Sequence, residues 1–272
     1  MIRASHLNCA SFCPVGWSWM ASESVGLVCH CLLLETEQGL VLVDTGFGTE
    51  VIQQRQALIG RSLTRLGRPS FDPKETALAQ IESLGYRARD VQHIICTHLD
   101  PDHAGGLSDF PDARVHVYGA ELTEALAPRW SQRPRYRSGL WAHGPRWQPH
   151  EDLGEPWRGF EAVRDLPGLP PDILLVPLLG HSAGHCGVAV DTGDQWLLHC
   201  GDAYFHFAEL QEPPRCPGVL KASQRLLAID NSARLENQAK LRALARASAG
   251  ELQVFCAHDE TEFGRCQSDS TV

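Results

Sequence analysis

The sequence predicts a layered α/β fold, and two observations lead to this class. Short apolar segments typical of buried strands alternate along the chain with longer segments of helical character. Several of the apolar segments end on aspartate or histidine, so side chains that can bind metal or transfer protons lie at the ends of predicted strands. With 272 residues, of which 43% are hydrophobic, the chain is long enough to bury a large core.

Each element follows from a local pattern. Residues 27–35 and 40–43 predict a hairpin that turns at Glu37-Gln38-Gly39. Residues 51–72 indicate mixed helix and loop, and a helix is expected over 73–84. Further strands are predicted at 93–96, 114–117, 173–177 and 187–191, and an amphipathic helix at 234–247.

Residues 128–171 differ in composition from the rest of the chain. They are rich in aromatic residues, proline and arginine, which indicates a long insertion within a single domain spanning 1–272. Two interpretations are open. The aromatic side chains could form a substrate wall or a homodimer contact, or they could form the small core of a surface subdomain.

Side chains that can bind a metal ion are most closely spaced in the segment 97–106. His98, Asp100, Asp102 and His103 fall within six residues, directly after the predicted strand 93–96. Imidazoles and carboxylates this close together desolvate or repel one another unless a cation balances them. The spacing therefore predicts a metal site, with a polar loop of ordinary histidines as the alternative.

Composition excludes several classes of function. The net charge of −9 and the pI of about 5.8 argue against nucleic acid as a partner. No segment approaches the roughly 18 apolar residues of a membrane span, and the N-terminal residues lack a signal-peptide core, so a cytoplasmic location is expected. The ten cysteines include no C-x-x-C pair, which excludes a zinc ribbon.

Residues 97–106 resemble the H-x-H-x-D-H signature of the metallo-β-lactamase superfamily, with Asp100 where that family usually has its second histidine. Four other segments resemble further family motifs in the right order: 40–46, 179–185, 197–202 and 254–259. The length and the position of His258 near the C-terminus are similar to the quorum-quenching lactonase branch. The resemblance implies an αββα sandwich, in which two mixed β-sheets lie between helices.

The resemblance also implies two divalent metal ions, with zinc favoured and manganese or iron open because Asp100 adds a hard oxygen ligand. One ion would take His98, Asp100 and His181, and the other Asp102, His103 and His258, with Asp202 as the bridge. Asp44 and His185 would orient these ligands. The implied catalytic residues are Asp102 and Tyr204, although Tyr204 follows Asp202 by two positions instead of the three that the family leads us to expect.

By this resemblance the protein is a metal-dependent hydrolase, in which a metal-bound hydroxide attacks a small ester, lactone or related carbonyl substrate. Three alternatives stay open. One is a sulfur dioxygenase with a single iron, and another is a thioester hydrolase similar to glyoxalase II, which only fourteen residues after His258 disfavour. The third is a metal-binding relative without catalytic activity. The expected partner is a small-molecule substrate, with no nucleic acid and no membrane.

Overall fold

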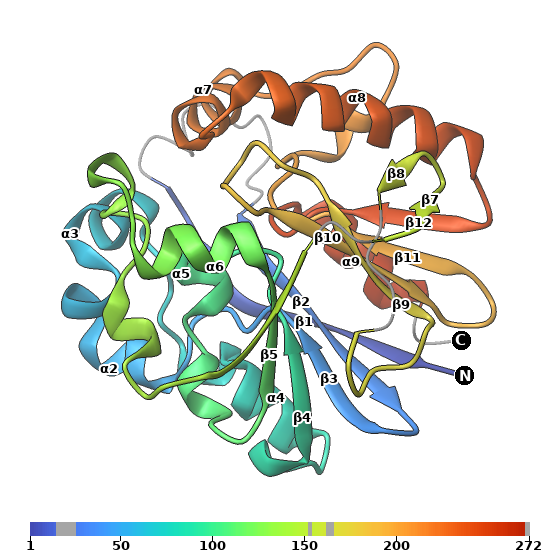
Figure 1. The fold of residues 1–272 in the computed structure, drawn as a ribbon. Coiled ribbons are helices and arrows are strands. Elements are labelled where there is room, and N and C mark those ends of the chain that lie inside the picture. Colours follow the sequence, from blue (N-terminus) through green and yellow to red (C-terminus); the bar gives the residue numbers. More distant parts are fainter. Residues whose placement is uncertain (15–25, 152–153, 162–165, 270–272) are drawn as a thin grey trace.

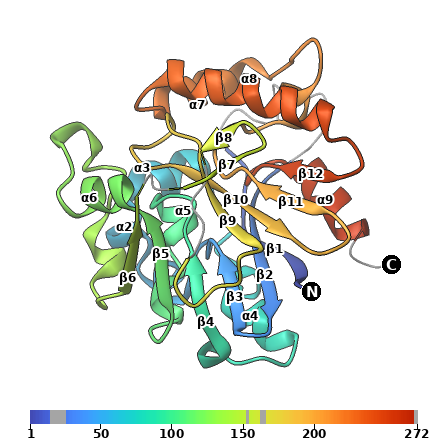
Figure 2. The ribbon, with the colours of Figure 1, turned by 45° about the vertical axis from the view of Figure 1, so that its right-hand side comes forward.

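Two mixed β-sheets lie face to face between two groups of helices, and Figures 1 and 2 show this αββα sandwich from two sides. The computed structural model describes residues 1–14, 26–151, 154–161 and 166–269. Within these residues, no helix combines the length and the apolar character that a membrane crossing needs. The predicted fold class and the sandwich architecture are confirmed.

The first sheet has six strands in sequence order: β1 (Arg3–Phe12), β2 (Leu27–Thr36), β3 (Gly39–Val43), β4 (Val91–Ile95), β5 (Arg114–Tyr118) and β6 (Arg146–His150). Its first two pairings are antiparallel, and β3 to β6 run parallel. The second sheet follows the order β12 (Leu252–Phe255), β11 (Trp196–His199), β10 (Cys186–Asp191) and β9 (Ile173–Pro177). A small hairpin joins β7 (Pro156–Trp157) to β8 (Phe160–Glu161).

The α-helices of the described residues are α2 (Thr49–Leu58), α3 (Gly60–Ser62), α4 (Ala77–Ser83), α5 (Pro101–Ala104), α6 (Gly119–Leu126), α7 (Gly218–Leu227), α8 (Asn231–Ala247) and α9 (Glu260–Asp269). Short turns of other helical types are η1 (Leu63–Gly67), η2 (Pro73–Glu75), η3 (Ala88–Asp90), η4 (Leu107–Asp109), η5 (Trp130–Gln132), η6 (Ser138–Trp141) and η7 (Phe207–Leu210). Helices α2, α4, α5 and α6 bury side chains against the first sheet, and α8 does so against the second.

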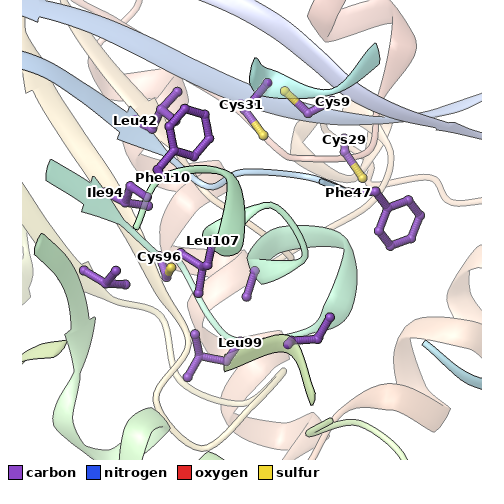
Figure 3. Close-up of a cluster of buried hydrophobic side chains, with 14 of the residues drawn as sticks. Cys9, Cys29, Cys31, Leu42, Phe47, Ile94, Cys96, Leu99, Leu107 and Phe110 are labelled. Carbon is purple, nitrogen blue, oxygen red and sulfur yellow. The ribbon is translucent and has the colours of Figure 1, made fainter. Parts of the chain in front are cut away.

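Both faces of the first sheet are buried, and the alternation of side chains along each strand divides them between two cores. Leu42 and Ile94 face the helices, where they pack near Phe110 in the cluster drawn in Figure 3. Val43 and Ile95, one residue further along each strand, face the second sheet. Truncating a fully buried leucine such as Leu42 to alanine costs about 2–5 kcal/mol of stability.

Most predicted elements are present with shifted ends. The hairpin forms β2 and β3, but the helix expected from residue 73 begins at Ala77, because Thr76 Oγ1 accepts a hydrogen bond from Ala79 N. Residues 73–75 form a separate 3₁₀ turn. The insertion supplies strand β6 to the first sheet, which its prolines and arginines did not indicate.

The described aromatic side chains of the insertion pack mainly into the two outer cores. Tyr136 and Trp141 join the core beneath the helices of the first sheet. Trp157 and Phe160 join the core between the second sheet and α8. The insertion is therefore integrated into both halves of the sandwich instead of forming a core of its own.

Candidate metal centre

The polar side chains singled out from the sequence gather where several strands end. Asp44 follows β3 and residues 97–103 follow β4, and these two strands are parallel and adjacent. Asp202 and His258 follow the parallel strands β11 and β12. Neighbouring parallel strands end at the same edge of a sheet. The polar residues that follow β3 and β4 therefore lie together, and so do those that follow β11 and β12.

One group of possible metal ligands combines His98, Asp100, His181 and Asp202, whose ligand atoms all lie within 4.8 Å of one another. His181 Nε2 lies 3.1 Å from Asp100 Oδ2 and 3.4 Å from Asp202 Oδ2. His98 Nε2 lies 3.4 Å from Asp100 Oδ2. All four residues are buried, so the carboxylates face imidazoles instead of water.

A second group combines His103, His258 and Asp202. Asp202 Oδ1 lies 3.2 Å from His103 Nε2 and 3.1 Å from His258 Nε2. Asp102 borders this group, with its Oδ2 3.7 Å from His258 Nε2 and 3.9 Å from His103 Nε2. Asp202 therefore turns Oδ2 toward the first group and Oδ1 toward the second, which is the geometry of a bridging carboxylate.

Hydrogen bonds at Nδ1 of three of these four histidines leave their Nε2 atoms available to a cation. His98 Nδ1 pairs with Thr97 Oγ1 at 3.0 Å, His103 Nδ1 donates to Asp44 Oδ2 at 2.8 Å and His258 Nδ1 donates to the Val28 carbonyl at 2.7 Å. The Nε2 atoms of His98 and His103 are buried and make no hydrogen bond. Buried polar atoms without partners are rare, and here they fit divalent metal ions held by nitrogen and oxygen ligands.

Asp44 and His185 make hydrogen bonds to residues of the two groups of possible metal ligands. Asp44 takes a left-handed backbone conformation, with φ 57°, and accepts hydrogen bonds from Thr97 N and Oγ1 as well as from His103. Burial opposes the charge on Asp44, but the nearby His103 brings the pKa of this carboxyl below its ordinary value. His185 donates from Nδ1 to the Leu178 carbonyl and accepts at Nε2 from Asp202 N, at 2.8 Å each.

Asp100 has a charged partner that the sequence did not indicate. Arg135, from the insertion, places Nε 2.9 Å from Asp100 Oδ1 and donates from its Nη atoms to the carbonyls of His181 and Leu227. Burial disfavours the ionised carboxyl, yet the Arg135 guanidinium and His98 hold the pKa of Asp100 well below its usual range. Because these residues are far apart in sequence, no spacing rule could have identified the pair.

Glu121, on α6, is a second residue that the sequence did not single out. Its carboxylate is fully buried and accepts hydrogen bonds from Leu99 N, Tyr136 Oη, Ser182 Oγ and Gly184 N at 2.7–3.0 Å. These donors belong to the loop after β4, the insertion and the loop that carries His181. One carboxylate therefore joins three segments around the first ligand group.

Tyr204 does not join the site, contrary to the catalytic role expected from the sequence. It is fully buried in the core between the second sheet and α8, and its hydroxyl lies 3.0 and 3.1 Å from the two carboxyl oxygens of Glu262. The physical reason is its position in the turn after β11, which directs the ring into this core. Phe205, the next residue, instead packs its ring against His258 and His181, at centroid distances of 4.9 and 6.2 Å.

Comparisons with known proteins identify the family of this chain. The sequence profile of the metallo-beta-lactamase superfamily matches residues 25–254. The chain is 44% identical over 261 residues to a probable metallo-hydrolase of Mycobacterium tuberculosis. The alignment covers 95% of this chain and 80% of that protein. It is 27% identical over 171 residues to an N-acyl homoserine lactonase of Bacillus cereus, which covers 62% of this chain and 60% of the lactonase.

Solved structures show the same fold at low sequence identity. A variant of AiiA from B. thuringiensis, with N-decanoyl-L-homoserine at its active site, aligns with a TM-score of 0.71 and 20% identity. This alignment covers 97% of the present chain and 96% of AiiA. AidC, a dizinc quorum-quenching lactonase, aligns with a TM-score of 0.56 and 18% identity, covering 86% of this chain and 73% of AidC.

Proposed function

Because this chain belongs to the metallo-beta-lactamase superfamily, as a hydrolase that depends on divalent metal ions, we propose that it opens a small lactone or cleaves a related ester. The single observation that carries this proposal is the position of Asp202 between two groups of ligands. A carboxylate shared in this way fits a pair of ions that act on one substrate. The lactonase relatives named above support the choice of a lactone or ester.

We propose that His98, Asp100, His181 and Asp202 hold one ion, and that Asp102, His103, His258 and Asp202 hold the other. When bound, such ions supply Lewis acidity that activates water and polarises a carbonyl group. Zinc is the favoured metal because four of the seven ligand positions are imidazoles and a fifth, Asp202, is a carboxylate that the two ions would share. The hard oxygens of Asp100 suit manganese or iron as well. Arg135 keeps Asp100 ionised and leaves Oδ2 directed at the ion.

Asp102 is the residue that we propose to move a proton. With 17% of its side chain exposed, it has more contact with solvent than Asp100 or Asp202, at 12% and 4%. Its Oδ2 faces the second ligand group, which leaves Oδ1 of the same carboxylate to take a proton from the attacking water and return it to the leaving alkoxide. Phe205 and Phe12 are buried on either side of the His258 ring, so apolar side chains border this side of the centre.

The test is hydrolysis by protein that has been stripped with a chelator and then reloaded with zinc, manganese or iron. We expect activity to return with metal on N-acyl homoserine lactones or on simple esters, and the D202N variant to stay inactive under the same loading. A thioester in the panel, and oxygen uptake with a persulfide, would identify the two alternative enzyme classes. Full metal binding without turnover of any of these compounds would contradict the proposal.

Three further expectations stay predictions. They are a single catalytic domain over residues 1–272, a homodimer and a location in the cytoplasm. Sedimentation velocity at several protein concentrations measures the oligomeric state, and cell fractionation measures the location.

A further inference from the structure

A second cluster of metal-competent side chains lies outside the centre described above. His6 on β1, His30 on β2 and Cys266 on α9 each direct one ligand atom to a common place, and these three atoms lie within 4.8 Å of one another. His30 and Cys266 are 1% and 2% exposed, and His6 is 9% exposed. None of the three belongs to either ligand group around Asp202.

The two imidazoles are in direct contact, but their hydrogen-bonding capacity is not used up. His6 Nδ1 and His30 Nε2 are 2.7 Å apart, so these two atoms share one proton. His30 Nδ1 is buried and has no hydrogen-bond partner. Leaving a buried donor or acceptor unsatisfied costs about 1–3 kcal/mol, so the fold holds these two rings in contact at a cost in stability.

The surroundings fix the rings and keep them neutral. The ring of His30 stacks on Phe255 at a centroid distance of 4.6 Å and meets Phe263 edge-on at 4.9 Å. Burial, with a contribution from nearby His199, lowers the pKa of His6 to about 4. Burial of this kind favours the uncharged imidazole, the form that binds a metal ion.

We propose that His6, His30 and Cys266 form a second metal site for a thiophilic ion such as Zn²⁺. Two imidazoles and a thiolate are a ligand set that zinc prefers. On binding, Cys266 releases its thiol proton to solvent, and each imidazole keeps its one proton on the nitrogen that faces away from the ion. Two nitrogens that bind one zinc ion tetrahedrally lie roughly 3.3 Å apart, so His6 Nδ1 and His30 Nε2, now 2.7 Å apart, need to separate by about 0.6 Å.

The site would join the two ends of the chain. Strand β1 is the first element and α9 the last of the described residues, and these two elements are in contact. Helix α9 begins at Glu260, two residues after His258, so an ion on Cys266 would also anchor the segment that follows this ligand. The expected role is structural, because all three side chains are buried and the ion would hold β1, β2 and α9 together.

The experiment counts ions and identifies the thiolate. Stripped protein is reloaded with Zn²⁺ alone, and zinc per chain is compared between the wild type, C266S and C216S, in which the exchanged cysteine is only half buried. We expect C266S to hold about one ion fewer than the other two. This difference does not depend on how many ions the centre around Asp202 holds, or on whether that centre is catalytic.

Cobalt supplies the second measurement. Co²⁺ bound to a thiolate gives a charge-transfer band in the near ultraviolet, which we expect in the wild type and not in C266S. The H6Q variant, altered at the most exposed ligand, should weaken the band while circular dichroism remains that of a folded protein. Equal zinc content in the wild type and C266S would overturn the proposal. So would a band that disappears only in C29S, since Cys29 lies beside Asp102 and His258.

Discussion

Arg135 Nε lies 2.9 Å from Asp100 Oδ1, so the ligand position where the family signature has a histidine carries a carboxylate that is paired with a guanidinium. Both side chains are largely buried, at 8% and 12% exposure. The two residues act as a unit, because removing one partner of a buried ion pair leaves an uncompensated charge that costs about 3–5 kcal/mol.

This pairing predicts a double-mutant effect on metal binding. D100H alone should lower metal content, because it leaves the Arg135 charge beside an imidazole, and R135Q alone should weaken binding about 10–100-fold by freeing Asp100. The D100H/R135Q double variant should bind more metal than D100H. Plasma emission spectroscopy on dialysed protein gives the ion content. R129Q, at an exposed arginine of the same insertion, is the control, and a double variant no better than D100H would refute the coupling.

The bridging position of Asp202 predicts unequal effects of two ligand substitutions. D202N should empty both ligand groups, because each oxygen of Asp202 faces a different group. H181A should empty only the first group, leaving about one ion per chain. Measuring the metal content per chain of both variants tests whether D202N loses more ions than H181A. Retention of both ions by D202N would show that Asp202 is not shared.

The hydrogen bonds that Glu121 accepts predict that replacing this residue lowers the free energy of unfolding, before any effect on catalysis. In E121Q the amide nitrogen cannot accept, so at least one buried backbone N–H loses its partner, at a cost of about 1–3 kcal/mol. Urea unfolding of stripped protein should give a lower midpoint than for the wild type. E82Q, at an exposed position of α4, should change the midpoint much less. Equal midpoints for E121Q and E82Q would show that the hydrogen bonds of Glu121 do not stabilise the fold.

The buried position of Tyr204 predicts that removing its hydroxyl group lowers stability and leaves activity unchanged. Its hydroxyl contacts Glu262 in the core, so Y204F should leave kcat and KM unchanged while stability falls by about 1 kcal/mol. Kinetics on the substrate found for the wild type, together with thermal unfolding, measure both quantities. A large fall in kcat with unchanged stability would return Tyr204 to the active site.

A chain of buried histidines predicts a dependence of stability on pH. His116 lies between His93 and His150, with ring nitrogens 2.8 and 2.9 Å apart, and burial together with these neighbours lowers its pKa to about 3. The unfolded chain takes up this proton near pH 6.5 and the folded chain does not. The stability is therefore present above pH 6.5 and falls as the pH drops from there toward 3.

The H116Q variant tests that dependence. Its melting temperature should fall less between pH 7 and pH 5 than that of the wild type, because one proton-binding difference is gone. H143Q, at an exposed histidine, should retain most of the wild-type fall. If H116Q and the wild type lose the same number of degrees, the histidine chain does not contribute.

Local pattern was enough to predict those parts of the fold and of the candidate site that depend on neighbours in sequence. The strands with alternating or continuous apolar residues, such as 173–177, were predicted at nearly their observed bounds. The cluster at 97–106 stood out because four ligand types fall within six residues.

Contacts between distant segments could not be predicted in the same way. Arg135 looks like one of many arginines in the insertion, and Glu121 like any acid on a short helix, until the fold brings them to Asp100 and to the loop of His181. Tyr204 shows the opposite error, because proximity to Asp202 in sequence does not decide which core a side chain enters. Strand β6 was missed since an edge strand needs fewer apolar residues than a central one.

Protein hydrogen bonds hold the ligand residues, from Asp44 to Thr97 and His103, between His185 and Asp202, and from Glu121 to three segments. We therefore expect ions to exchange on the assembled protein, without refolding. Which metal occupies the centre in a living cell then follows from the supply of free ions at least as much as from the ligands. A preparation grown in manganese-rich or iron-rich medium should carry that element in place of zinc.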